Sequence, residues 1–208
     1  MSRRISTDAT IGTADLFGAP AVPDGFKYQP EVLTEAEEQE LVRRFEKLPF
    51  KPFEFKGYLG NRRIYTFGRG YVFAGQEPRA DASIPDYLLP LQQIASRISE
   101  KPAEAFEQIM VTEYAPGAGI GWHRDRPSYE DIAAISFVSS CRLRLKRKLA
   151  SGWERQSVLI DPRSAYLLHG PVRDSWQHSI APQDELRYSV TLRTFKAADS
   201  KRVSKRNR

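Results

Sequence analysis

The sequence contains very little cysteine, few histidines and no long hydrophobic run. Cys141 is the only cysteine in 208 residues, so no intrachain disulfide can form. The longest apolar stretches, such as residues 133–138, are far shorter than a membrane span. No apolar segment follows the two arginines near the N-terminus, so no secretory signal is readable. These absences predict a cytoplasmic protein without a membrane partner.

The excess of positive charge is small once it is divided along the chain. The formal net charge is +6, but six of the 32 lysines and arginines lie in residues 196–208, beside one aspartate. The remaining chain has 26 basic and 25 acidic residues and is nearly neutral. The basic tail over 196–208 either contacts phosphates or is a solvated end. The chain as a whole has 40% apolar and 28% charged residues, which is typical of one globular domain.

Two helices are expected before the first strong β-pattern. Residues 1–25 are rich in small and polar residues and are predicted to form a flexible arm. Thr34 and Glu37 form a capping box that begins a helix over residues 34–48. An apolar stripe predicts a second helix over residues 84–99, capped by Ser83. Pro90 inside this segment predicts a kink or a late start.

The chain after Phe106 is predicted to be β-structure. Runs of high β-propensity are expected as strands over residues 106–114, 120–125, 132–148, 157–168, 175–180 and 186–195. Loops rich in proline and glycine separate several of them. Short strands at this spacing indicate a sandwich or jelly roll rather than βαβ units. The predicted class is therefore α+β, with two helices supporting a mostly antiparallel β-roll.

Two of the three histidines fit a metal site. His123 and Asp125 are two residues apart, so on a strand both side chains point to the same face. His178 follows 55 residues later on another predicted strand. Two histidines and a carboxylate that meet in a β-roll form a facial triad, which suits non-haem Fe(II) oxygen chemistry. The alternative is a surface His-Asp pair with an unrelated structural histidine.

The last predicted strand alternates two kinds of side chain. Arg187, Ser189, Thr191 and Arg193 share one face, and apolar or aromatic residues share the other. A buried arginine must be paired or must bind an anion, because an unpaired buried charge is very unfavourable. The planar guanidinium matches a carboxylate with two hydrogen bonds, so a dicarboxylate is a natural ligand. A structural pair with Asp or Glu is the alternative.

The ordered motifs resemble those of the AlkB-type Fe(II)/2-oxoglutarate-dependent dioxygenases. They are the His-x-Asp pair, the distant histidine in Trp-x-His-Ser-Ile, and Arg-Tyr-x-x-Thr-x-Arg in the last strand. Two further stretches are also similar to the family's: Glu-Tyr-Ala-Pro-Gly-Ala from residue 113, and Asp-Pro-Arg-Ser from residue 161. The resemblance covers residues 106–195, is thinner over 26–105 and is absent from the tail.

The resemblance implies a double-stranded β-helix, or jelly roll, as the catalytic core over residues 106–195, with helices and a substrate lid over 26–105. It implies that His123, Asp125 and His178 bind Fe(II). The residues that it implies for 2-oxoglutarate or its surroundings are Tyr114, Arg187, Arg193, Thr112 and Ser189. The implied reaction converts 2-oxoglutarate and O2 to succinate and CO2 while a substrate C–H bond is hydroxylated. That bond is commonly in an N-methyl group, whose hydroxylated form loses formaldehyde.

Departures from the family's pattern concern the substrate more than the cosubstrate. Thr112 and Ser189 stand where DNA-repair members often have asparagine, and both can still form hydrogen bonds. Some base-repairing members carry an acidic residue just after the His-x-Asp pair, whereas Arg126 and Pro127 follow here. The sequence therefore leaves the preferred base open.

Residues 53–73 alternate aromatic and basic side chains among glycines. The family has a lid in this region, where aromatic rings could stack on a base and arginines could hold phosphates. The candidate substrate contacts are Arg62, Arg63, Tyr65, Phe67, Arg69 and Tyr71. The alternative is a hairpin with core aromatics and solvated arginines.

Three other features each have a functional and a structural interpretation. Arg142, Arg144 and Lys146 alternate with leucines as either a phosphate track or a solvated sheet face. His169 is either a contact near the site or a hydrogen-bonded histidine beside a turn. Cys141 is expected to be a buried small residue.

The sequence predicts a monomeric Fe(II)/2-oxoglutarate-dependent dioxygenase whose partner is DNA or RNA with alkylated bases, which it demethylates. The same chemistry on a methylated protein or a small molecule is one alternative. A jelly roll that binds nucleic acid without turnover is another. A zinc hydrolase with the same three ligands would leave the arginine strand unexplained.

Overall fold

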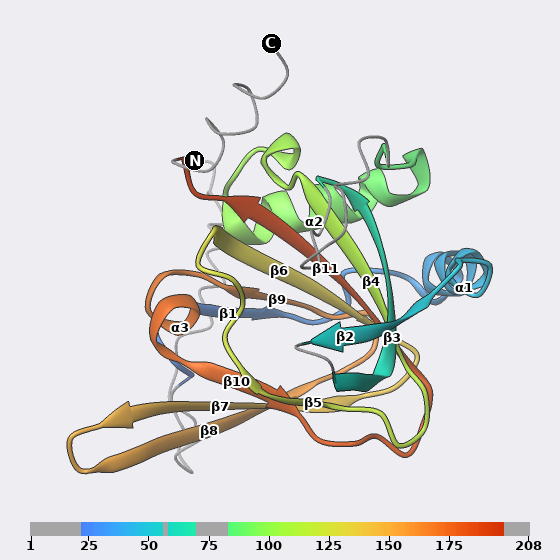
Figure 1. The fold of residues 1–208 in the computed structure, drawn as a ribbon. Coiled ribbons are helices and arrows are strands. Elements are labelled where there is room, and N and C mark those ends of the chain that lie inside the picture. Colours follow the sequence, from blue (N-terminus) through green and yellow to red (C-terminus); the bar gives the residue numbers. More distant parts are fainter. Residues whose placement is uncertain (1–21, 56–57, 70–82, 198–208) are drawn as a thin grey trace, which may run out of the picture.

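The computed structural model describes residues 22–55, 58–69 and 83–197 (Figure 1). Its helices are α1 (Glu35–Phe45), α2 (Leu89–Ser99) and α3 (Gly170–Ser175), with 3-10 turns at Asp86–Leu88 and Ala103–Ala105. The strands of the N-terminal half are β1 (Phe26–Gln29), β2 (Lys51–Phe55), β3 (Tyr58–Gly68), β4 (Gln108–Tyr114) and β5 (Ile120–His123). Those of the C-terminal half are β6 (Tyr129–Phe137), β7 (Cys141–Leu149), β8 (Gly152–Ile160), β9 (Ala165–Leu168), β10 (Gln177–Ile180) and β11 (Arg187–Phe195). No helix among the described residues has the length and apolar character needed to cross a bilayer.

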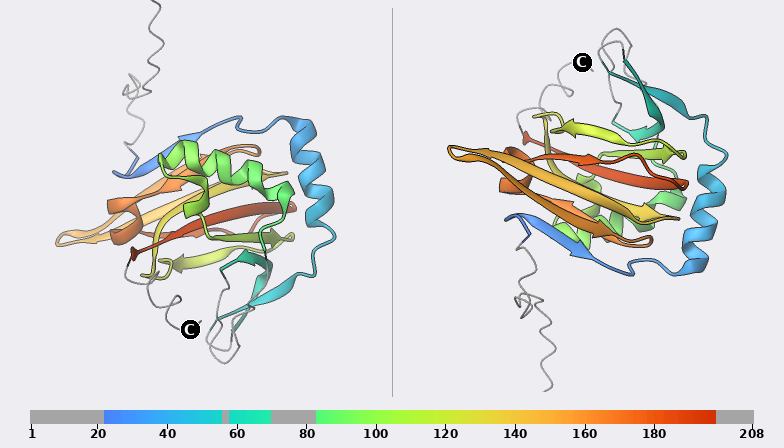
Figure 2. Two further views of the ribbon diagram at one scale, coloured as in Figure 1. Left: turned by 90° about the horizontal axis from the view of Figure 1, so that it is seen from above. Right: turned by 90° about the horizontal axis from the view of Figure 1, so that it is seen from below.

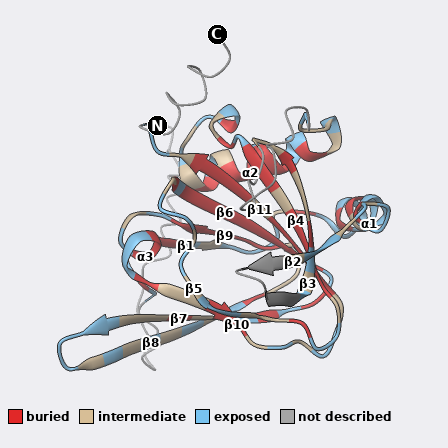
Figure 3. Cartoon of the chain, in the orientation of Figure 1, coloured by how far each residue is buried: buried red, intermediate tan, exposed pale blue. Residues whose placement is uncertain are grey.

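The strands form two antiparallel sheets. The larger sheet has the order β1-β9-β6-β11-β4-β3-β2, and the smaller one β5-β10-β7-β8. The smaller sheet faces one side of the larger, and α2 crosses the other side (Figures 1 and 2). The larger sheet is therefore covered on both faces, and Figure 3 shows its central strands as mostly buried.

Side-chain alternation along the strands creates two separate cores. On β11, Tyr188, Val190 and Leu192 point toward the helices and pack with α1 and α2. Between the sheets, Leu143 and Leu145 of β7 pack with apolar residues of the larger sheet. The faces of β11 agree with the alternation expected from its sequence, so its polar residues are turned toward the smaller sheet.

The first helix begins as expected but ends early. The amide of Glu37 donates to Thr34 Oγ1 at 3.3 Å, and the amide of Thr34 donates to Glu37 Oε2 at 2.8 Å, so the capping box is confirmed. The helix ends at Phe45 rather than at residue 48. Its last turn tightens into i→i−3 bonds, such as Leu48 N to Phe45 O at 2.9 Å, before the chain enters β2.

The second helix shows the late start that its proline predicts. A 3-10 turn precedes it, and the α-helix begins at Leu89 with Pro90 in the first turn. The expected cap at Ser83 is wrong, because the N-cap position is Leu88 and no side chain caps it. Pro90 has no amide proton and fits only where that donor is not needed, which places the helix start beside it.

Two of the expected long strands are each divided by a tight turn. The segment 132–148 separates into β6 and β7 around Val138 (φ 75°), and the segment 157–168 into β8 and β9 around Arg163 (φ 60°). One carboxylate on α1 holds both turns: Glu38 accepts from the Val138 amide at 2.8 Å and from Arg163 Nη1 at 3.0 Å. Residues other than glycine seldom adopt positive φ, so neither Val138 nor Arg163 indicates a turn by itself, although Asp161-Pro162 favours one beside Arg163. The short helix α3 and the early start of β8 were likewise not expected.

Candidate metal centre and its cavity

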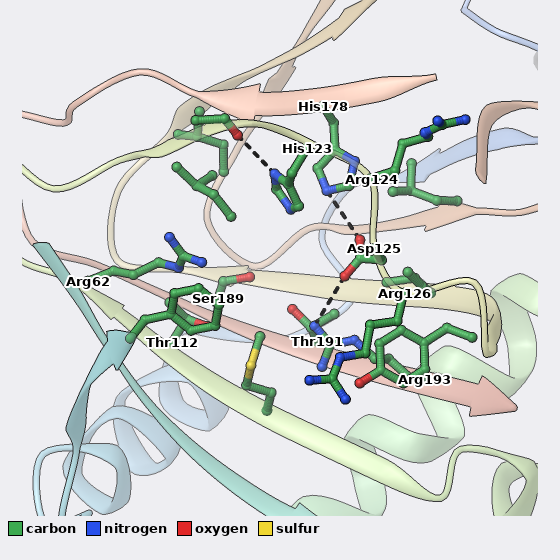
Figure 4. A pocket seen from close by; sticks show the side chains of 18 of the residues that line it. Arg62, Thr112, His123, Arg124, Asp125, Arg126, His178, Ser189, Thr191 and Arg193 are labelled. Carbon is green, nitrogen blue, oxygen red and sulfur yellow. Dashed lines mark hydrogen bonds and ion pairs between the residues drawn. The ribbon is translucent and has the colours of Figure 1, made fainter. Parts of the chain in front are cut away.

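The three expected metal-binding side chains lie together in a cavity between the two sheets. The cavity has a volume of about 400 Å³, a size typical of ligand sites. One ligand atom each from His123, Asp125 and His178 can be chosen so that all three lie within 4.8 Å of one another. Figure 4 shows these side chains pointing toward one another.

The smaller sheet positions the two histidines. His123 on β5 is the direct cross-strand partner of His178 on β10, and the ring centroids are 4.2 Å apart. His123 Nδ1 lies 2.9 Å from the carbonyl oxygen of Gly121, which only accepts hydrogen bonds. In the neutral ring Nδ1 therefore carries the proton, and Nε2 keeps the lone pair that a metal requires.

Asp125 reaches the same space from a loop. The strand β5 ends at His123, so the expected strand over 120–125 is too long and alternation alone does not place Asp125. Its Oδ2 lies 3.3 Å from His178 Nε2, and its Oδ1 lies 3.6 Å from Arg193 Nη2. Arg173 of α3 holds the loop in place, because its Nη2 donates to the carbonyl oxygens of Arg126 and Tyr129.

The electrostatics of the cluster favour the protonation states that metal binding requires. Burial lowers the pKa of His178 to about 4, with the neighbouring His123 acting in the same direction. Burial alone would raise the pKa of Asp125, but electrostatic interactions with its neighbours, His178 and Arg193 first among them, outweigh burial, and the pKa is lowered. At neutral pH the cluster therefore offers a carboxylate and a neutral imidazole, the forms that bind a metal ion.

Arg187 has the chemistry of an anion-binding residue. Its side chain is fully buried on β11 opposite Tyr114 of β4, and its Nε donates to Ser136 Oγ at 3.1 Å. Within the described part of the chain, neither Nη atom makes a hydrogen bond of normal geometry. Burial raises the pKa of Tyr114, and the charge of Arg187 offsets part of that shift. A buried guanidinium with two unsatisfied donors fits a carboxylate ligand.

The other residues expected near the cosubstrate also lie at this cavity. Thr112 and Tyr114 line it from β4, and Ser189 and Arg193 line it from β11. Arg193 Nη1 also donates to Gln108 Oε1 at 3.3 Å, which fixes the guanidinium beside Asp125. The cavity wall thus contains the three expected metal ligands and four of the five residues expected near the cosubstrate. Arg187 does not itself line the cavity and is fully buried behind it, opposite Tyr114.

The expected substrate-lid residues are divided by the alternation of β3. Arg62 lines the cavity, and its Cζ lies 3.8 Å from the ring centroid of Phe53, which lines it too. Arg63 instead makes a double hydrogen bond to Glu113, and Tyr65 and Phe67 pack toward the helical side. These three therefore lie on the other face of the sheet, as a hairpin with core aromatics would place them.

The last two candidates of this segment do not line the cavity. The Arg69 guanidinium lies 3.9 Å from the ring centroid of Phe195, and its Nη1 is 3.3 Å from Glu107. Tyr71 lies outside the described residues.

Sequence reasoning missed several residues of the cavity wall. Among those that line it without having been expected are Phe53, Met110, Trp122, Arg124, Arg126, Tyr129 and Tyr166. Met110 could have been found from alternation, because it precedes Thr112 and Tyr114 at intervals of two on β4. Among the described residues that line the cavity, Asp125 is the only carboxylate, whereas Arg62, Arg124 and Arg126 add positive charge. The cavity wall is therefore positively charged apart from the metal cluster.

The third histidine is part of the structure rather than of the cavity. His169 Nδ1 lies 2.5 Å from Oδ1 of the buried Asp131, which is also paired with Lys101. His169 precedes α3 directly, so the hydrogen-bonded histidine beside a turn is what the structure shows. Cys141 is buried, as expected.

Two packed antiparallel sheets with a His-Asp-His cluster between them define the class of facial-triad iron oxygenases. A family model described as the 2OG-Fe(II) oxygenase superfamily matches residues 25–204, and the chain belongs to that superfamily. Its members use Fe(II), 2-oxoglutarate and O2, so the expected cofactors are confirmed.

The relatives confirm the AlkB-type resemblance. The chain is 26% identical over 173 residues to mouse "tRNA (carboxymethyluridine(34)-5-O)-methyltransferase ALKBH8", covering 80% of this chain and 26% of that protein. It is 28% identical over 118 residues to zebrafish "Probable RNA/DNA demethylase ALKBH6" (57% and 48%), and 32% identical over 126 residues to the uncharacterized mimivirus protein L905 (53% and 58%). The chain thus spans at most about 58% of the length of these relatives.

Solved structures share the fold. OsALKBH1 superposes with a TM-score of 0.59 at 15% identity, covering 84% of this chain and all of that one. A Pseudomonas putida prolyl-4-hydroxylase gives a TM-score of 0.55 at 18% identity, covering 83% and 93%. Both are jelly-roll oxygenases, so the predicted jelly roll is confirmed at the level of the fold.

Proposed function

We propose that this oxygenase oxidatively demethylates N-alkylated bases in DNA or RNA, as in the repair of alkylation damage. The observation that carries the proposal is the cavity itself. Its wall combines the His-Asp-His cluster with Phe53, Arg62 and Trp122, an aromatic and basic set that suits a base and its phosphate. The relatives named as demethylases or alkylated-DNA repair proteins support the same substrate class.

We infer that the two sheets form the double-stranded β-helix of the family, supported by α1 and α2. In this arrangement His123, Asp125 and His178 hold Fe(II), and Arg187 binds the distal carboxylate of 2-oxoglutarate. The unsatisfied Nη atoms of Arg187 support this role. Tyr114, Thr112 and Ser189 supply hydrogen bonds to the same molecule. When bound, the iron and the cosubstrate supply the chemistry that hydroxylates a methyl group and releases succinate, CO2 and then formaldehyde.

The residues of the chain orient the reactants. Arg193 keeps the Asp125 carboxylate turned toward the two histidines, through the 3.6 Å ion pair. Phe53 and Trp122 contribute to the cavity wall, where a base that has left its stack would find an aromatic residue. Ile132, Leu168 and Ile180 add apolar surface to the cavity wall, which would help to exclude water from the reacting methyl group.

Mass spectrometry of methylated oligonucleotides tests this proposal. We expect loss of a methyl group from single-stranded DNA or RNA in the presence of Fe(II), 2-oxoglutarate and O2. His178→Ala should abolish the loss. His169→Ala removes the histidine outside the cavity and should leave it intact. Succinate without methyl loss from any oligonucleotide would refute the base-demethylase proposal and indicate a protein or small-molecule substrate.

A further inference from the structure

The outer face of the smaller sheet carries a concentration of positive charge. Four cations of β7 point away from the core in alternation with buried Leu143 and Leu145, and β8 adds one more. We call these residues, with two exposed tryptophans beside them, the outer basic face: Arg142, Arg144, Lys146, Lys148, Arg155, Trp122 and Trp153. The four strands contain one acidic residue, Glu154, which lies on the opposite side and pairs with Arg147 at 2.5 Å. The outer face of the sheet therefore carries no carboxylate.

The tryptophans and cations form one continuous layer. Lys146 Nζ lies 4.3 Å from the ring centroid of Trp122 and 4.6 Å from that of Trp153, so it sits between the two indoles. Arg144 contacts the Trp122 ring at 5.3 Å, and Lys148 the Trp153 ring at 5.5 Å. The indoles remain 37% and 43% exposed. Their cation contacts orient them and leave aromatic surface open to a ligand.

This arrangement is unfavourable for the isolated protein. Lys146 lies directly opposite Arg155 in the β7–β8 pairing, and like charges in that position repel. On α1, by contrast, Arg43 and Arg44 share Glu40 as a partner. A face that served solubility alone would carry charges of both signs and few tryptophans. Repelling cations beside open aromatic rings match a polyanion that also carries flat bases.

The outer basic face joins the cavity at Trp122. This residue precedes His123, lines the cavity, and contacts both Arg144 and Lys146. The β7–β8 hairpin extends from this point beyond the rest of the molecule, and Figure 3 shows much of it as exposed. A chain that enters the cavity past Trp122 would thus find a stripe of cations leading outward along β7.

We propose that the outer basic face binds the nucleotides that flank the target base in a single-stranded nucleic acid. The proposal rests on the proposed function in taking a nucleic acid as the substrate. Phosphates contact Lys146, Arg142 and Arg155, and unpaired bases stack on the Trp153 indole. A duplex would present only its phosphates to this face, so an unpaired strand makes fuller use of it.

Fluorescence anisotropy with an unmodified, labelled single-stranded oligonucleotide tests the proposal on the full chain. The test variant is Lys146→Glu/Arg155→Glu. Its control, Lys47→Glu/Arg97→Glu, makes the same change in net charge at exposed positions on the helical side. We expect the test variant to bind about tenfold more weakly, with a slope of log Kd against log salt that is shallower by about 1.4. The control should bind within about twofold of the unaltered protein. Trp153→Ala should weaken binding by about fivefold or more, because a stacked base is lost.

Equal binding by the test variant and its control would overturn the proposal. So would binding to anionic lipid vesicles or to duplex DNA in preference to the single strand. Succinate formation without substrate should be unchanged in Lys146→Glu/Arg155→Glu, because neither residue lines the cavity, and this confirms that the variant is folded. The measurement needs neither iron nor a methylated base. Binding through this face without demethylation would therefore refute the proposed function alone, and demethylation with unaltered binding would refute this inference alone.

Discussion

Replacing Arg187 by methionine tests whether its unsatisfied donors bind a carboxylate of 2-oxoglutarate. Methionine keeps an unbranched side chain of similar length but removes the charge and all five N–H donors. The Arg187 side chain is fully buried, its Nε is bonded to Ser136, and neither Nη atom makes a hydrogen bond of normal geometry within the described residues. If 2-oxoglutarate satisfies those atoms, the substitution should affect cosubstrate binding far more than folding.

The size of the effect follows from the number of bonds. Two hydrogen bonds between a guanidinium and a carboxylate contribute about 1.5 kcal/mol or more each, so the loss is at least about 3 kcal/mol, or roughly 150-fold in Kd. Folding should respond differently. Removing a buried charge with unsatisfied donors is favourable, and leaving Ser136 without its partner is unfavourable, so the two changes largely cancel. The melting temperature of the protein without cosubstrate should change by no more than about 4 °C.

Calorimetric titration of 2-oxoglutarate into protein loaded with Mn(II), together with thermal unfolding, measures both quantities. Arg163→Met is the matched control, since the Arg163 side chain binds Glu38 at 3.0 Å and does not line the cavity. This control should leave the Kd unchanged and lower the melting temperature. If Arg187→Met bound 2-oxoglutarate within about threefold of the unaltered protein, or lost as much stability as the control, Arg187 would be a structural residue and the cosubstrate assignment would be wrong.

Three further predictions concern the metal cluster, the base and the core. Arg173→Met should weaken Co(II) affinity by about tenfold, because the loop that carries Asp125 loses its anchor, and a spectroscopic Co(II) titration measures this change. The arginines of the cavity wall should favour an uncharged base over a cationic one. N3-methyluracil should therefore be demethylated about fivefold faster than cationic 1-methyladenine. In a mass-spectrometric competition assay, Arg126→Glu should reduce or reverse that ratio. Phe45→Ala should lower the free energy of unfolding by about 3–5 kcal/mol in a denaturant titration, since the ring is fully buried between the sheet and α1.

The sequence predicted those parts of the molecule whose signals are local. The capping box at Thr34, the delayed helix at Pro90 and the two faces of β11 each depend on neighbouring residues, and the structure shows all three. The His-x-Asp spacing and the distant His178 could be recognised because chemistry restricts them to few residue types.

Features that depend on long-range contacts could not be predicted. The turns at Val138 and Arg163 are both held by Glu38, from which they are 100 and 125 residues away in the sequence. No local pattern reveals that contact, although Asp161-Pro162 is a turn signal beside Arg163. Arg173 in α3 has the same property, since only the folded chain places it beside the carbonyl of Arg126. In residues 53–73 the sequence showed that basic and aromatic residues are present, but not to which side of the sheet each side chain points. The register of β3 against β4 decides this.

The candidate site requires the whole β-roll, because each of the two sheets supplies different residues to it. His123 and His178 lie on the smaller sheet, whereas Arg187 and Arg193 lie on the larger one. The His-Asp-His cluster and the arginines that we propose to lie around the cosubstrate therefore face each other only when the core between the sheets is packed. The outer basic face is on the back of the strand that pairs with β10, so a nucleic acid bound there lies one strand away from His178. A nucleic acid on that face would thus stabilise the sheet that carries both histidines. Binding of the nucleic acid would in this way be linked to the geometry of the metal cluster.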